Sequence, residues 1–331
     1  MKREETKYFA YTKSMSHRKR KLIGISVLVI CVLFLGIYLF HHTKNSSPKI
    51  VPETAKNSMK KIPADVKKVL DKQAQTASLS ATYHIPILMY HYVEYIQDKK
   101  DKERQLLNVT PPVFESQIQT LLQAGYTMIT AKELGDILDG KMPMPDKPIM
   151  LTFDDGHWDL DTYVVPIIKK YQVKVTAYIV PGFVGTNTDS LTQKQLQDVV
   201  DSGLVDIGAH TVHHISLKGK SLAKAQYEIG ESKTMLEQQY HIHVLSFAYP
   251  YGSFDLQSLK LVQQAGFTTA ASTIAGNEQN QQNRFFLFRV RPGYSTGNAL
   301  LKYLNLKWKP YTFNPEAKPT EASSQAIMKP E

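Results

Sequence analysis

Cysteine is almost absent from this chain of 331 residues. The single cysteine, Cys31, lies inside an apolar run, so the protein cannot form an intramolecular disulfide. An exported domain without disulfides must rely on its hydrophobic core for stability. The chain is long enough to bury such a core, as one large α/β domain or as two smaller domains.

An excess of charge is also absent from most of the chain, although the formal total is +10. Residues 1–21 carry +6 and residues 41–72 carry +5, which leaves −1 for residues 73–331. The basic character therefore belongs to the N-terminal segments, and it does not indicate nucleic-acid binding by the remainder. Lipid headgroups or an anionic cell wall are better partners for these lysines.

One long run has no charged residue at all. Residues 22–40 are 19 apolar or small residues, about 28 Å as a helix, which is enough to cross a bilayer. The basic residues before this run predict a cytoplasmic N-terminus and an extracellular remainder, as in a single-pass cell-membrane protein. A cleaved signal peptide is the alternative, but its apolar region would be shorter, and no small-x-small cleavage site follows residue 40.

The composition divides the chain into five predicted parts. Residues 1–21 form a basic cytoplasmic tail, 22–40 the transmembrane anchor and 41–82 a flexible Lys-rich stalk with a short helix near 64–70. Residues 83–312 form the predicted folded domain. Residues 313–331, rich in Pro, Ser, Glu and Ala, form a disordered tail.

Strand-like and helix-like segments alternate in residues 83–312, and no internal repeat is present. The predicted strands are 85–93, 127–130, 149–153, 175–180, 205–209, 244–248 and 268–272. The predicted helices are 110–124, 131–138, 159–171, 192–200, 221–240 and 255–265. Repeated β-α units of this kind predict an α/β fold with a parallel sheet, closed or nearly closed into a barrel.

Two adjacent carboxylates, Asp154 and Asp155, follow the apolar strand 149–153 on a Gly turn. Burying such a pair without partners would cost several kcal/mol, and a cation is an economical partner. His210 and His214 are possible co-ligands, because one carboxylate and two imidazoles leave coordination positions open for water and substrate.

Further polar or aromatic groups lie at the ends of other predicted strands. His91 ends the first strand, His210 follows another, and Tyr249-Pro250-Tyr251-Gly252 follows a third. In a parallel β/α barrel these strand ends converge on the face where active sites are built. Taken singly, each motif is ordinary, since Asp-Asp-Gly is usually a surface turn and His-x-x-x-His is common in helices and loops. Together and in this order they indicate a functional site.

Three of these motifs resemble the first three motifs of the polysaccharide deacetylases, the NodB-homology or carbohydrate esterase family 4 domain. They are Thr152-Phe153-Asp154-Asp155-Gly156, His210-Thr211-x-x-His214 and Phe247-Ala248-Tyr249-Pro250-Tyr251-Gly252. The opening Pro86-Ile87-Leu88-Met89-Tyr90-His91 resembles the poly-N-acetylglucosamine deacetylase branch. The resemblance covers about residues 84–300.

The resemblance implies a distorted (β/α)7 barrel and a divalent metal, commonly zinc. By motif match, Asp155, His210 and His214 would be the metal ligands and Asp154 the general base. A metal lowers the pKa of its bound water and polarises the amide carbonyl, while a neighbouring carboxylate removes the proton. The backbone N–H of Tyr251 would stabilise the oxyanion.

The chain departs from the family pattern in two places. Where many members carry an arginine that tethers the base, this chain has Ala248, and Arg289 is either its substitute or a surface salt-bridge arginine. The histidine that usually acts as general acid is missing, because no histidine follows His243. His91 or a metal-bound water would replace it, unless His91 only packs beneath the pocket.

The roles of other residues near the motifs are less specific. Tyr249 and Tyr251 either stack against sugar rings or form the wall of the site. His157 and His213 do not match ligand positions, and we treat both as neighbours.

The sequence therefore predicts a membrane-anchored extracellular hydrolase of amide bonds that removes N-acetyl groups from peptidoglycan or an exopolysaccharide. We expect a monomer that binds an N-acetylated polysaccharide and no nucleic acid. An inactive glycan-binding protein and an O-acetyl esterase are the alternatives. A zincin protease is disfavoured, because it needs His-Glu-x-x-His in a helix and Thr211 occupies the Glu position.

Overall fold

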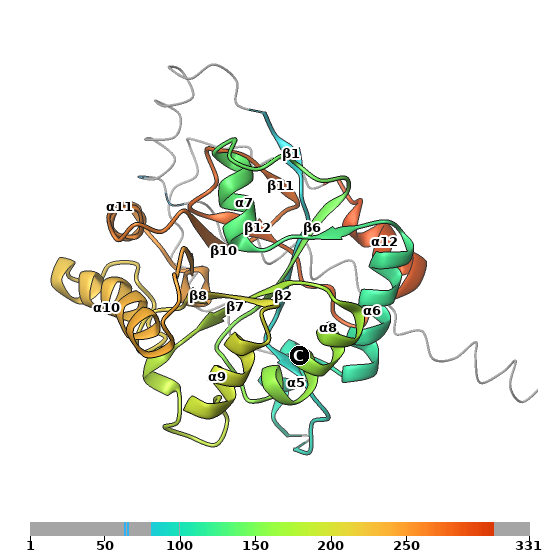
Figure 1. The fold of residues 1–331 in the computed structure, drawn as a ribbon. Coiled ribbons are helices and arrows are strands. Elements are labelled where there is room, and N and C mark those ends of the chain that lie inside the picture. Colours follow the sequence, from blue (N-terminus) through green and yellow to red (C-terminus); the bar gives the residue numbers. More distant parts are fainter. Residues whose placement is uncertain (1–62, 64, 66–80, 99, 308–331) are drawn as a thin grey trace, which may run out of the picture. The chain divides into compact units, whose positions relative to one another are not determined.

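The computed structural model describes residues 63, 65, 81–98 and 100–307 (Figure 1). The strands are β1 (Tyr83–His84), β2 (Ile87–Tyr90), β3 (Tyr92–Val93), β4 (Asn108–Val109), β5 (Thr127–Met128), β6 (Pro148–Phe153), β7 (Val175–Ile179), β8 (Val205–Ala209), β9 (Ser246–Ala248), β10 (Thr269–Ala275), β11 (Glu278–Gln279) and β12 (Leu287–Arg289). The α-helices are α5 (Lys102–Leu107), α6 (Pro111–Gln123), α7 (Ala131–Leu138), α8 (Val165–Tyr171), α9 (Gln193–Asp201), α10 (Leu222–Tyr240), α11 (Leu256–Gln264) and α12 (Gly297–Leu304). Short helical turns are η1 (Leu160–Val164), η2 (Pro181–Phe183) and η3 (Pro250–Gly252).

Seven parallel strands form the central sheet in the order β12-β10-β9-β8-β7-β6-β2, and β5 pairs with β6 at one end. The two outer strands of this order, β12 and β2, are joined by hydrogen bonds through Val290, which directly follows β12. The N–H of Met89 in β2 donates to the carbonyl of Val290 at 2.9 Å. The N–H of Val290 donates to the carbonyl of Ile87 at 2.8 Å. The sheet is therefore a nearly closed barrel of parallel strands, and the predicted α/β barrel class is confirmed.

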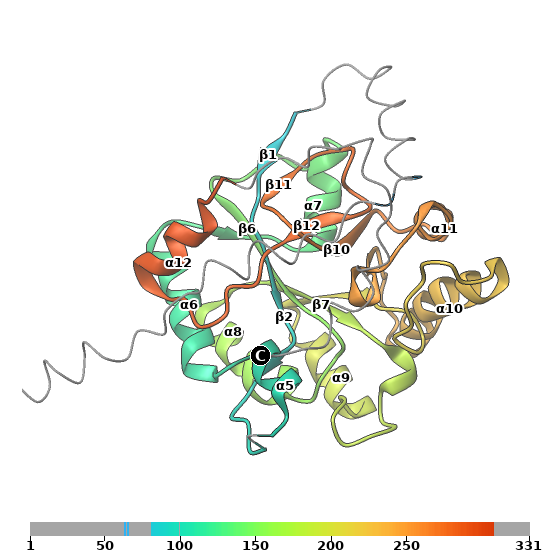
Figure 2. The same cartoon turned by 180° about the vertical axis from the view of Figure 1, so that it is seen from behind.

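The strands of the barrel are apolar because they are covered on both faces. All six residues of β6 and all five of β7 are buried. Figures 1 and 2 show the helices α6 to α11 arranged around the outside of the strands. The main core lies between the strands and these helices, and each Leu, Ile or Phe buried there contributes about 1.5–3 kcal/mol.

Capping residues explain why the helices begin where the sequence predicts. The side chain of Thr130 accepts from the N–H of Glu133, whose carboxylate accepts from the N–H of Thr130 in return. The same reciprocal capping box opens α9 at Thr192 and α11 at Asp255. Each box satisfies backbone donors that have no partner in the first helical turn.

The helix predicted over 159–171 differs from a regular α-helix in its first half. Residues Leu160–Val164 form a π-helical turn, in which the N–H of Val165 donates to the carbonyl of Leu160, and α8 follows. Pro166 has no N–H to donate and its ring excludes a regular preceding turn, which gives a physical reason for the wider turn.

No helix within residues 81–98 and 100–307, or at the two isolated described positions, is long and apolar enough to span a bilayer. The predicted membrane segment 22–40 lies outside the described residues. The basic tail 1–21, nearly all of the stalk 41–82 and the C-terminal tail 313–331 lie outside them as well.

Candidate active site

The carboxyl ends of several barrel strands bring the predicted site residues together. Asp154 and Asp155 follow β6, His210 follows β8, and His91 follows β2. Arg289 ends β12, next to β2 across the closure of the barrel. The convergence of strand ends that the sequence predicts is present in the structure.

Asp155, His210 and His214 form a compact group whose ligand atoms all lie within 4.8 Å of one another. The Oδ1 atom of Asp155 is 3.3 Å from Nε2 of His210 and 3.1 Å from Nε2 of His214. Asp155 and His214 both have positive φ, 76° and 51°, which is uncommon for residues with a side chain. The fold holds this local strain, and the strained backbone directs both side chains into the same space.

The chemistry of these three atoms fits a bound cation. Nδ1 of His210 lies 2.7 Å from the carbonyl of Ala248 and is placed to donate its proton there, which leaves a lone pair on Nε2. Oδ1 of Asp155 is buried and has no hydrogen-bond partner among the described residues. Two imidazole nitrogens and a carboxylate oxygen that converge on one point are the donor set of a catalytic zinc or iron site.

Asp155 is held in the charged form that a metal requires. Its burial opposes ionisation, but interactions with His157, His210 and His214 outweigh burial and keep the pKa of Asp155 well below its usual value. The carboxylate is therefore ionised at neutral pH and available as a ligand.

His157 contacts the second oxygen of Asp155, a role that its position in the sequence did not reveal. Its Nε2 atom lies 3.4 Å from Oδ2 of Asp155, and its Nδ1 atom lies 3.2 Å from the carbonyl of Asp189. The imidazole stacks on the ring of Tyr92, with centroids 4.0 Å apart, and the guanidinium of Arg104 covers Tyr92 at 4.4 Å. Tyr92 lies in β3, Arg104 in α5 and Asp189 in the segment before α9, so sequence spacing carries no signal for this arrangement.

Arg289 forms a bidentate pair with Asp154. Nη1 and Nη2 of Arg289 donate to Oδ1 and Oδ2 of Asp154, each at 2.7 Å. Nε of Arg289 donates to the carbonyl of Ser272 at 2.8 Å, and Nη1 also donates to Thr152 at 3.1 Å. Arg289 is 1% exposed, so it is a buried partner of Asp154 and not a surface salt-bridge arginine.

This pair keeps Asp154 ionised in the interior. Burial opposes the charge of Asp154, but the charge of Arg289 and its hydrogen bonds outweigh burial and lower the pKa of the carboxyl. The pair also fixes the orientation of the carboxylate, as a planar guanidinium does with a planar carboxylate.

His91 lies beside the Asp154–Arg289 pair, with its Nε2 atom 4.0 Å from Oδ2 of Asp154. Burial lowers the pKa of His91 to about 4, although the charges of Asp154 and Asp155 act in the opposite direction. The imidazole is therefore neutral near pH 7. This weakens the prediction that His91 donates a proton as the general acid.

The two predicted tyrosines have different environments. Tyr249 is fully buried and stacks on Phe254, with ring centroids 4.8 Å apart, so its ring is not available to a sugar and forms part of the wall. Tyr251 is 54% exposed, and its ring centroid lies 4.7 Å from that of His214. Of the two, only Tyr251 presents a surface at the site.

His213 points away from the three converging atoms. Its Nδ1 atom lies 2.9 Å from Oε1 of the buried Glu228, and its backbone N–H donates to Oε2 of the same residue at 3.0 Å. This arrangement agrees with the prediction that His213 is a neighbour, and it holds the loop between His210 and His214 against α10.

Comparisons with known proteins find polysaccharide deacetylases. Residues 141–270 match the family model described as polysaccharide deacetylase. The Bacillus subtilis protein YxkH is 26% identical over 288 residues, which cover 86% of this chain and 98% of that protein. The poly-beta-1,6-N-acetyl-D-glucosamine N-deacetylase of Staphylococcus aureus is 24% identical over 291 residues, covering 83% of this chain and 93% of that protein.

A solved structure gives the same result for the fold. The Streptococcus pyogenes deacetylase PplD, in complex with acetate, superimposes with a TM-score of 0.62 and 26% identity. The match covers 69% of this chain and all of that chain. With the barrel and the motifs at its strand ends, these matches show that residues 141–270 carry a polysaccharide deacetylase domain and that the chain is similar to polysaccharide deacetylases over most of its length.

Proposed function

We propose that this protein is a metal-dependent N-deacetylase that hydrolyses the acetamido groups of an N-acetylglucosamine-containing polysaccharide. The observation that supports the proposal most strongly is that two adjacent carboxylates have different partners. Asp155 meets His210 and His214, while Asp154 meets Arg289 and has no imidazole within 3.5 Å among the described residues. One carboxylate is thus placed to bind a cation and its neighbour to accept a proton.

Asp155, His210 and His214 would hold the metal, and a zinc ion suits two imidazoles and one carboxylate. When bound, the metal supplies Lewis acidity, which lowers the pKa of water and polarises the acetamide carbonyl. Asp154 takes the proton from the attacking water. Arg289 keeps Asp154 ionised beforehand and correctly oriented, which is the requirement for a general base.

The developing oxyanion needs donors, and the backbone N–H of Tyr251 is our candidate. Tyr251 has φ of 57° between Pro250 and Gly252, a tight turn held where the chain crosses the site. The proton that the leaving nitrogen needs comes from His91 or from a water. The neutral state of His91 near pH 7 favours the water. Acetate and a free amine are the products.

We also propose that the catalytic domain works outside the cell, carried by residues 22–40 as a membrane anchor. The support is the uncharged run and the basic residues before it. Polymers of N-acetylglucosamine lie on that side of the membrane, and the basic stalk is suited to an anionic wall.

Acetate release from N-acetylglucosamine oligomers by the metal-loaded protein tests the activity. We expect release by the wild type and a loss of at least about 100-fold in Asp154→Asn, which cannot act as a base. A protein that carries metal but releases no acetate from any N-acetylated glycan would contradict the proposal. Binding of those glycans without turnover would instead favour the glycan-binding alternative, and turnover of ester-linked acetyl groups alone would favour the esterase.

A further inference from the structure

A second arginine lies next to the proposed catalytic site and takes no part in the mechanism above. Arg291 follows Arg289 by two residues, and residues two apart in an extended chain point to the same side. Val290, between them, is buried in the core outside the barrel. Arg289 is buried against Asp154, whereas Arg291 is exposed.

Arg291 has no ionic partner within the part of the chain that the structure describes. No carboxylate among the described residues forms an ion pair with its guanidinium, although Asp154 and Asp155 are near enough to act on its pKa. Burial of part of the side chain and the charge of Arg289 lower the pKa of Arg291. An anion bound beside Arg291 would relieve this unfavourable charge.

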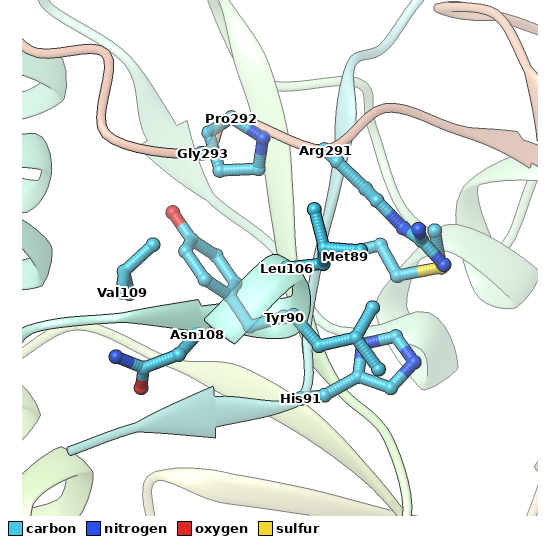
Figure 3. Close-up of a pocket in the computed structure, with 10 residues that line it drawn as sticks. Met89, Tyr90, His91, Leu106, Asn108, Val109, Arg291, Pro292 and Gly293 are labelled. Carbon is cyan, nitrogen blue, oxygen red and sulfur yellow. The ribbon is translucent and has the colours of Figure 1, made fainter. Parts of the chain in front are cut away.

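The surroundings of Arg291 combine this charge with an apolar surface. Arg291 and His91 line one shallow pocket together with Met89, Leu106, Val109 and Pro292 (Figure 3). The pocket is open to solvent and its cavity volume is only about 20 Å³, and Leu106 at its edge is 82% exposed. A volume of this size holds about one water-sized group, far less than the roughly 300–1,000 Å³ of usual ligand sites, so only the tip of a substituent, such as a carboxylate, would enter while the sugar lies outside.

We propose that Arg291 forms a subsite for the carboxylate of an acidic glycan, carried by a substituent adjacent to the acetamido group that is hydrolysed. The proposal rests on the deacetylase function and decides between its substrates. In glycan strands of peptidoglycan whose stem peptides have been removed, every second sugar carries a lactyl ether with a free carboxylate on the carbon next to the acetamido carbon. Its carboxylate matches the guanidinium and its methyl group matches the apolar wall, whereas poly-N-acetylglucosamine offers no anion.

Binding measured by calorimetry tests the subsite without requiring turnover. The protein is metal-loaded Asp154→Asn, with and without Arg291→Gln. The ligands are peptide-free peptidoglycan strands of defined length and the same strands with their carboxylates converted to methylamides. We expect the Asp154→Asn protein that retains Arg291 to bind the acidic strand at least about tenfold more tightly than the amidated strand. Adding Arg291→Gln should remove this preference.

Two control variants sharpen the measurement. Arg291→Lys keeps the charge but loses the bidentate geometry, so it should retain part of the preference. Lys260→Gln makes the same charge change at an exposed position on α11 and should leave the preference intact. Equal binding of the acidic and amidated strands by the Asp154→Asn protein that retains Arg291 would overturn the subsite. Equal weakening of the binding of both strands by Arg291→Gln would overturn it as well.

Released acetate is the other carboxylate that Arg291 could bind. Acetate inhibition of the otherwise wild-type enzyme, measured with and without Arg291→Gln, separates the two. If Arg291→Gln weakened acetate inhibition but left the preference for the acidic strand unchanged, the substrate subsite would be overturned and Arg291 would be assigned to product binding. Absence of acetate release from every glycan, with the binding preference intact, would reject the deacetylase function and leave the subsite standing.

Discussion

Both carboxylate oxygens of Asp154 accept hydrogen bonds from Arg289, at 2.7 Å each, inside a barrel where neither residue is exposed by more than 3%. The two residues are far apart in the sequence and meet because β12 closes the barrel against β2. The ionised state of the proposed base therefore depends on the closure of the barrel.

Replacing Arg289 by Met should remove this support. Asp154 would then be a buried charge without a partner, and breaking such pairs typically costs about 3–5 kcal/mol of stability. A misplaced or protonated base should also lower acetate release by about 100-fold. Urea unfolding and acetate release check the two effects.

The double variant Asp154→Asn/Arg289→Met separates stability from activity, because it also removes the unpaired carboxylate. It should recover part of the lost stability and none of the activity. An Arg289→Met variant with wild-type stability and turnover would show that the pair has no functional role.

His157 should influence metal binding without being a ligand, since its Nε2 atom lies 3.4 Å from the Asp155 oxygen that faces away from His210 and His214. Groups that orient a metal ligand typically contribute about 10–100-fold to metal affinity. We expect His157→Ala to weaken zinc binding by about this factor in competition with a chelator. His243→Gln, at an exposed histidine far along the chain, is the matched control and should bind normally. Unchanged zinc affinity in His157→Ala would leave His157 a neighbour only.

Gly252 should not tolerate a side chain. A Cβ there would lie 2.1 Å from Oγ1 and 2.7 Å from the backbone N of Thr273, and its φ of 61° already disfavours other residues. Gly140 has a similar φ of 71° but nothing within 4 Å of its Cβ. Gly140→Ala should cost about 1 kcal/mol from the backbone alone, and Gly252→Ala about 1–3 kcal/mol more. Equal losses in thermal unfolding would mean that Thr273 moves freely.

Asp206 lies at the opposite end of β8 from His210 and should make the stability of the fold depend on pH. Burial raises its pKa to about 6, although the N–H and charge of Lys132 and the hydroxyl of Thr176 act to lower it. The native state therefore binds a proton more readily than the unfolded chain between about pH 4 and pH 6, and this contribution to stability is lost as pH rises through that range.

Asp206→Asn tests this prediction, because its amide oxygen can still accept from Lys132. The difference in unfolding free energy between the variant and the wild type should grow in favour of the variant from pH 4 to pH 6, by up to about 2 kcal/mol. A difference that stays constant across this range would mean that Asp206 ionises normally.

Much of the fold was predictable because buried parallel strands read as apolar runs and helices carry capping signals. Helix α7 has the predicted bounds, and β8 does too. Strand β12 was not predicted, since it has three residues and pairs with β10 through an irregular register. Helix α12 was also missed.

The site was predictable where chemistry follows a strand end, as for Asp155 and His210. It was not predictable where a contact joins segments far apart in the sequence, as for His157 with Asp189 and Tyr92. For Arg289 the sequence left two alternatives open, and only the closure of the barrel shows which group it meets. For Tyr249 a strand-end position does not reveal whether the ring faces the site or the core.

The central claim is that neighbouring carboxylates have separate tasks, Asp155 as a metal ligand and Asp154 as a base. Measurement of bound zinc per protein molecule together with acetate release, in the wild type, Asp154→Asn and Asp155→Asn, tests it most directly. We expect about one zinc in the wild type and in Asp154→Asn, acetate release only from the wild type, and loss of both zinc and activity in Asp155→Asn. Full zinc content in Asp155→Asn, or undiminished acetate release from Asp154→Asn, would contradict it.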